Sequence, residues 1–202
     1  MRTPDRETSP AKFVLFGICF AALLVIGISI IYRVLAPATH FSSYTQAELE
    51  FPSLDDASLS SEVKSLLLLA KSEYDNPQPG EFYAGGTWEP WCADFVSYLY
   101  KEAGYPFENP NTGAWRIPGI YTLREYLQAN NAWHPEADYH PVTGDIVIYD
   151  GGLFGGHTNI VVRVDGDYLV TVGGNENNQI RLDKFQWQDN KYGVQGFGHL
   201  ID

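Results

Sequence analysis

The spacing of apolar residues changes once along this chain, near residue 140, and that change limits the folds open to it. Before the change, apolar side chains recur at helical spacing, as in Val63, Leu66, Leu67 and Ala70. After it, short β-branched runs alternate with Gly and Asp, which is typical of strands joined by tight turns. Helices followed by strands indicate an α+β domain with an antiparallel sheet, rather than alternating strand–helix units.

The same patterns predict the individual elements. Segments with helical spacing lie at residues 58–75, 91–104 and 122–128, and the glycines and proline of residues 81–91 indicate a loop. Three strands are expected at residues 145–149, 158–164 and 168–172, and two more at 179–182 and 192–201. Residues 164–167, VDGD, are typical of a hairpin turn.

An apolar run without any charged residue, FVLFGICFAALLVIGISIIY, occupies residues 13–32 between Lys12 and Arg33. A helix needs about 20 such residues to cross the core of a bilayer, whereas the apolar core of a cleaved signal peptide is shorter. The sequence therefore predicts an uncleaved transmembrane helix over residues 13–34.

This helix would divide the chain into four parts. They are a cytoplasmic N-terminus (1–12), the anchor (13–34), a juxtamembrane spacer (35–57) and one folded domain (58–202). Basic residues concentrate before the anchor, and the positive-inside rule then leaves the N-terminus in the cytoplasm. We expect a single-pass protein of the cell membrane with its folded domain outside the cytoplasm.

The composition excludes some classes of partner. The formal net charge is -12, and no basic stripe follows Arg33, so a nucleic acid is not expected to bind. There are 2 cysteines, Cys19 inside the apolar run and Cys92 in the folded domain. No pair of cysteines has metal-ligand spacing, so Cys92 is a lone thiol.

The position of Cys92 makes it a candidate nucleophile. It follows Pro90 and Trp91 and opens the helix WCADFVSYLYKEAG. The first amides of a helix lack partners and its dipole is positive there, so a thiolate, the nucleophilic form, is favoured. The Cys92 amide is a candidate oxyanion donor, and Asp94 is an acid where the dipole favours one. Taken alone, a single cysteine after a tryptophan at a helix start is more often a buried core residue than a catalytic one.

Of the 5 histidines, His157 is the candidate base, because it stands at the mouth of a strand. The next strand runs antiparallel and ends in Gly173, Gly174 and Asn175. A tight hairpin brings Asn175 back to the level of His157, where an amide oxygen can orient the imidazole. Glu176 takes this role if the register of the hairpin differs by one residue.

Four features together resemble the CHAP amidohydrolases and peptidases: WCADFVSYLY, GDIVIYD, a histidine after a glycine-rich loop, and GGN. These are papain-like cysteine enzymes, many of which cut peptidoglycan. The resemblance covers about residue 61 to the C-terminus. It implies a papain-like α+β fold of the CHAP or NlpC type, with helices packed on an antiparallel sheet. It also implies Cys92 as nucleophile, His157 as base, and a polar residue of the next strand as the group that orients the histidine.

This chain departs from the family pattern at one position. Many members carry an acidic residue two positions before the asparagine, where this chain has Gly173, so the third catalytic role is assigned to Asn175. Some members bind calcium through paired aspartates ahead of the cysteine. Residues 74–91 have only scattered acidic residues, so we expect no metal ion and no cofactor.

The resulting hypothesis is a membrane-anchored peptidoglycan hydrolase that cleaves amide or peptide bonds of the cell-wall stem peptide through a thioester on Cys92. One alternative is a catalytically silent module that binds wall peptides and recruits a division or secretion complex. Another is an amidase acting on a small peptide conjugate. The tryptophans either line a groove for the substrate or pack in the core; they are Trp88, Trp91, Trp115 and Trp133. The choice between amidase and endopeptidase and the oligomeric state stay open.

Overall fold

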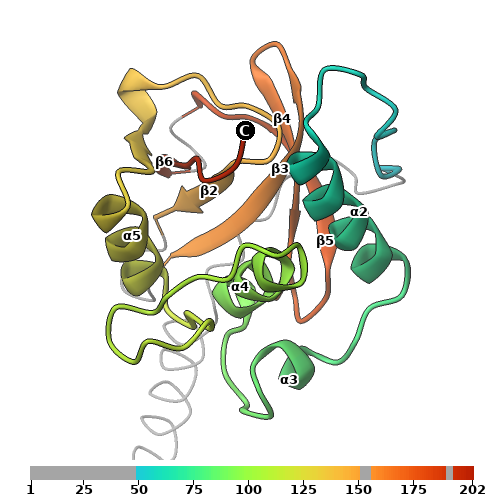
Figure 1. Ribbon diagram of the computed structural model, residues 1–202. Coiled ribbons are helices and arrows are strands. Elements are labelled where there is room, and N and C mark those ends of the chain that lie inside the picture. The colour runs from blue at the N-terminus through green and yellow to red at the C-terminus, as the bar shows by residue number, and fades with distance from the viewer. Residues whose placement is uncertain (1–48, 151–155, 190–192) are drawn as a thin grey trace, which may run out of the picture. The chain divides into compact units, whose positions relative to one another are not determined.

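The computed structural model describes residues 49–150, 156–189 and 193–202 (Figure 1). The chain divides into two compact units, Met1–Thr39 and His40–Asp202, and the described residues belong to the second. No helix among the described residues is long and apolar enough to span a bilayer. The predicted anchor at residues 13–34 lies outside the described residues.

The helices precede the main strands, as expected. They are α2 (Ser61–Asp75), α3 (Gly80–Tyr83), α4 (Cys92–Glu102) and α5 (Ile120–Ala129). The hydroxyl of Ser60 accepts a hydrogen bond from the Val63 amide at 3.1 Å and so caps the start of α2. The prediction of a loop over residues 81–91 is wrong at its start, where α3 forms. The reason is tertiary, because the Tyr83 side chain is fully buried and stacks on Trp91.

Within the described residues, six strands form one antiparallel sheet in the order β1-β6-β2-β3-β4-β5. They are β1 (Trp133–Pro135), β2 (Ile146–Tyr149), β3 (His157–Asp165), β4 (Tyr168–Gly173), β5 (Arg181–Gln186) and β6 (Val194–Gly198), with the 3-10 helix Glu136–Asp138 after β1. The three central strands and the α+β class are confirmed. β5 begins later than predicted, because Asn177 and Asn178 adopt left-handed backbone angles and extend the turn before it. The three-residue β1 was missed, since it depends on pairing with β6.

Apolar side chains cover both faces of the sheet. One face packs with α2, α4 and α5 around residues such as Leu67, Phe95 and Ile160. Apolar residues from five strands and Trp187 meet on the other face. They are Val147, Tyr149, Val161, Leu169, Phe185, Trp187 and Phe197. In Figure 1, α4 lies in front of the sheet, and it contacts β3 and β4.

A close approach between α4 and the end of β4 places the functional residues. A Cβ at Gly174 would lie 2.5 Å from the ring of Trp91 and 2.7 Å from the Cβ of Phe95, so no side chain fits there. The start of α4 therefore lies directly against the end of β4. Because β3 and β4 pair antiparallel, the end of β4 also lies beside the start of β3, where His157 stands.

Candidate active site

Cys92 is the first residue of α4, and its surroundings fix the start of that helix. The thiol is free and the residue is almost fully buried. The preceding Trp91 donates a hydrogen bond from its indole Nε1 to Oδ1 of Asn178 at 3.0 Å. Its ring also stacks on Tyr83 with 5.2 Å between centroids. The residue before the thiol is thus joined both to α3 and to the turn that follows β4.

His157 begins β3 and is in contact with Cys92. Burial lowers the pKa of His157. The negative charge of Cys92, its hydrogen bond to the imidazole and a hydrogen bond with Glu176 raise this pKa, and together they outweigh burial. The net result is a pKa of about 10, well above the ordinary value for histidine. A raised pKa means that the imidazolium persists at neutral pH. The start of β3 thus brings a protonated imidazole into contact with the Cys92 side chain at the start of α4.

The third residue differs from the one predicted. Nε2 of His157 lies 2.8 Å from Oε1 of Glu176, so the partner of the imidazole is Glu176 rather than Asn175. Asn175 has a φ of 61°, in the left-handed region. The left-handed angle of Asn175 turns the chain after Gly174, and the side chain of Glu176 then lies against His157. Glu176 is the alternative to Asn175 that the sequence left open for this position.

Comparison with known proteins was made for the whole chain. The family model described as CHAP domain matches residues 82–175, a range that contains Cys92 and His157. This match identifies residues 82–175 as a CHAP domain. Two similar solved structures are a crystal structure of Ly7917 and one of Ly7917 with the hydrolyzing product of MDP.

The first Ly7917 structure is 18% identical with a TM-score of 0.46, and the match covers 67% of this chain and 61% of that chain. The second is 20% identical with a TM-score of 0.37, and the match covers 52% of each chain. The matches thus span less than two thirds of the Ly7917 chain. A comparison with curated proteins gave no match.

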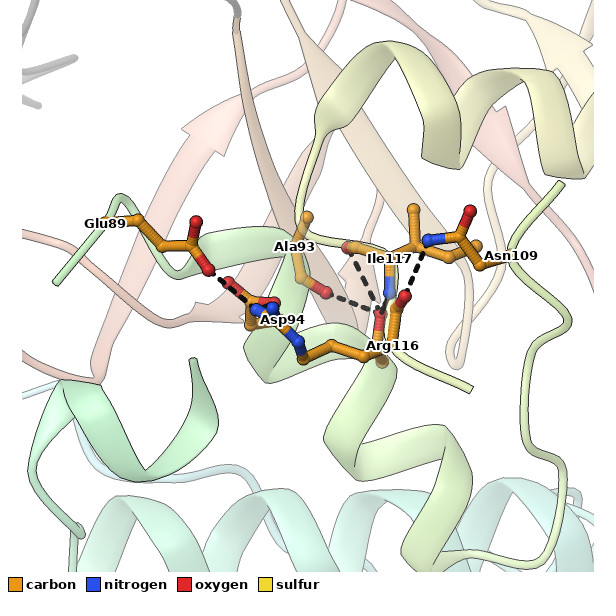
Figure 2. A network of polar contacts seen from close by, with 7 residues as sticks. Glu89, Ala93, Asp94, Asn109, Arg116 and Ile117 are labelled. Carbon is orange, nitrogen blue, oxygen red and sulfur yellow. Dashed lines mark hydrogen bonds and ion pairs between the residues drawn. The ribbon is translucent and has the colours of Figure 1, made fainter. Parts of the chain in front are cut away.

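A buried ion pair flanks Cys92 at the start of α4 (Figure 2). Nη1 of Arg116 lies 2.7 Å from Oδ1 of Asp94, in the first turn of α4, and 2.7 Å from Oε1 of Glu89, before the helix. The Asp94 side chain is 0% exposed. Burial raises its pKa to about 6, although the hydrogen bond and charge of Arg116 oppose that change. Asp94 is thus a buried ion-pair partner of Arg116 in the first turn of α4.

Further hydrogen bonds attach the segment that carries Arg116 to α4. The hydroxyl of Ser97 donates to the Ala93 carbonyl at 2.8 Å and accepts from the Ile117 amide at 3.1 Å. The side-chain amide of Asn109 donates to the Arg116 carbonyl at 2.8 Å, as Figure 2 shows. Arg116 is therefore held on both its backbone and its side chain. Arg116 could not be predicted from the sequence, because no local pattern links it to the helix that begins at Cys92.

The other residues considered from the sequence lie in different surroundings. Trp91 is buried in the core, whereas Trp88 is 91% exposed on the segment before the cysteine. His199 lies 2.9 Å from Asp145 and 2.9 Å from Asp202, as part of a separate cluster. Among the residues that the structure describes, no group of three or more His, Cys, Asp or Glu could hold a metal ion.

Glu176→Gln should lower the pKa of His157. Glutamine keeps the shape of the side chain but loses the negative charge that stabilises the imidazolium. The control is Asn175→Gly, since glycine adopts the left-handed angle without strain and should leave the pKa of His157 unchanged. The titration of the His157 ring protons by NMR measures both. An equal fall in the two variants would contradict the assignment of Glu176.

Proposed function

We propose that this chain is a cysteine hydrolase that cleaves amide or peptide bonds of the cell-wall stem peptide. The observation that carries the proposal is the continuous contact from Cys92 to His157 to Glu176. It supplies a nucleophile, a base and a carboxylate that orients the base, in the order that acyl transfer requires. The match to the CHAP domain supports a hydrolase, and an amidase or endopeptidase is the more specific form of this proposal.

The reaction proceeds in two stages. In the first, the Cys92 thiolate attacks the carbonyl carbon, and a carbon–sulfur bond forms while the carbonyl oxygen becomes an oxyanion. The Cys92 backbone amide is placed to stabilise this oxyanion, because the first-turn amides of a helix have no intrahelical partner. The carbon–nitrogen bond then breaks, and the His157 imidazolium gives its proton to the departing amine. A thioester on Cys92 is left.

In the second stage, neutral His157 removes a proton from water, and the resulting hydroxide attacks the thioester carbon. The carbon–sulfur bond breaks, the acid product leaves, and the imidazolium–thiolate pair forms again. Glu176 stabilises the imidazolium in both stages, because its carboxylate oxygen lies 2.8 Å from Nε2. The other ring nitrogen, Nδ1, is then the one available to the sulfur and to the substrate.

The proposal includes attachment to the cell membrane through residues 13–34, with the catalytic domain outside the cytoplasm. The uncharged apolar run and its basic N-terminal flank support this placement. The full-length chain should stay in the membrane fraction after washing with alkaline carbonate, and protease added to spheroplasts should reach the domain. Release by carbonate, or protection from protease, would refute the anchor or its orientation respectively.

The substrate is tested by digesting purified cell walls with the full-length chain in detergent and identifying the released fragments by mass spectrometry. An amidase separates whole stem peptides from intact glycan strands, whereas an endopeptidase shortens or unlinks the stems. A Cys92→Ala preparation serves as the blank. Wild-type protein that binds walls without releasing any fragment would refute hydrolysis and favour the silent binding module.

A further inference from the structure

Glu176 is held by a second side chain besides His157. Nδ2 of Asn159 donates to Oε1 of Glu176 at 3.2 Å and to Oγ1 of Thr171 at 3.1 Å. A carboxylate accepts hydrogen bonds, so the side of the amide that faces Glu176 must be its NH2 group. Asn159 is two residues after His157 on β3, so both side chains lie on the same face of the strand. One carboxylate oxygen therefore links the histidine and the asparagine.

Gly173, at the end of β4, leaves the space that the Asn159 side chain occupies. A Cβ at Gly173 would lie 1.9 Å from Oδ1 and 2.4 Å from Cγ of Asn159. Both distances are far below van der Waals contact, so a side chain at position 173 would displace the amide. Asn159 itself is 2% exposed and has no room to move toward solvent. The Asn159 amide can therefore occupy this space only because residue 173 is a glycine.

We propose that Asn159 is a positioning residue that acts on His157 through Glu176, and that Gly173 is required because it leaves room for the Asn159 amide. This inference rests on the proposed thiol chemistry of Cys92. Glu176 is partly exposed, between Asn175 and Asn177 in a turn where both asparagines are left-handed. Without the amide, the Glu176 carboxylate loses one of the hydrogen bonds that fix its position beside the imidazole, and a carboxylate that moves away from the ring stabilises the imidazolium less.

The first test replaces Asn159 with leucine, which has a similar volume but no donor. The rate of Cys92 alkylation by iodoacetamide is measured against pH, together with kcat and KM on wall fragments. The upper inflection of the alkylation rate, where His157 loses its proton, should move to lower pH, in the same direction as in Glu176→Gln. kcat should fall on the order of 10-fold with KM unchanged, as for other residues that orient a catalytic group. A purely structural role would lower the folded fraction and leave the inflection in place.

A reciprocal exchange covers the case in which Asn159→Leu does not fold. Gly173→Asn alone should displace Asn159 and lower kcat, and Asn159→Ala alone should do the same. The double variant Asn159→Ala/Gly173→Asn returns an amide to the same space from the neighbouring strand and should recover kcat above either single variant. An upper inflection unchanged in Asn159→Leu, or a double variant no better than the singles, would overturn the proposal. Alkylation needs no wall substrate, so failure of wall hydrolysis in the wild type would be a separate result.

Discussion

Cys92→Ala is expected to lower wall hydrolysis by on the order of 10⁴-fold or more, because it removes the atom that forms the thioester. The variant should still fold, since alanine occupies less space than cysteine at the first position of α4 and suits a helix. A second readout confirms that the site is assembled. Loss of the thiolate charge should lower the pKa of His157, which a titration by NMR detects.

The chain offers a matched control in Cys19→Ala, which removes the second cysteine from the predicted anchor. This variant should hydrolyse walls at the wild-type rate and keep the full reactivity of Cys92 toward iodoacetamide. If Cys92→Ala retained a tenth of the wild-type rate, a different nucleophile would have to be found. If Cys19→Ala lost activity, wall hydrolysis would depend on the predicted anchor as well as on Cys92.

Arg116→Met is expected to reduce the free energy of unfolding by about 3 kcal/mol at pH 8, because it leaves the fully buried Asp94 carboxylate without its cation. The loss should be smaller at pH 5. The pKa of Asp94 is raised to about 6, so below that pH the carboxyl is protonated and the charge of Arg116 matters less. Urea denaturation at the two pH values measures the difference.

Two further variants distinguish the loss of the Arg116–Asp94 ion pair from a general loss of side-chain packing. Arg124→Met removes an arginine that donates to Gln195 and lies over the ring of Tyr121, and it should cost similar amounts at pH 5 and pH 8. Adding Asp94→Asn to Arg116→Met removes the unpaired buried charge and should recover part of the lost stability. An Arg116→Met loss that is equal at both pH values would refute a charge-based role.

The strongest sequence predictions were those that depended on local spacing. The start of α4 at Cys92 and the hairpin from β3 to β4 follow from a helical apolar face and from a turn with Gly166 as its first central residue. The helix start and the hairpin are encoded within a few residues and survive packing against the rest of the domain. The choice of His157 as the residue beside Cys92 rested instead on its place at a strand end and on the resemblance to the CHAP family.

The side chain that contacts the His157 imidazole could not be predicted in the same way. It depends on the left-handed angle of Asn175, and the sequence permits that angle without requiring it. The link between Arg116 and Asp94 joins residues 22 positions apart and has no periodic signal. Trp91 and Trp88 illustrate the same limit, since only packing determines that one is buried and the other exposed.

The three groups of the proposed active site lie far apart along the chain, with Cys92 on α4, His157 at the start of β3 and Glu176 after β4. During synthesis the thiol leaves the ribosome first, and no imidazolium can reach it until β3 and β4 have been made and have docked on α4. The reactive sulfur therefore appears only when the domain is complete. Under the proposed mechanism, a partly made chain therefore lacks the imidazolium that Cys92 needs, and completion of the fold is the step that assembles the active site.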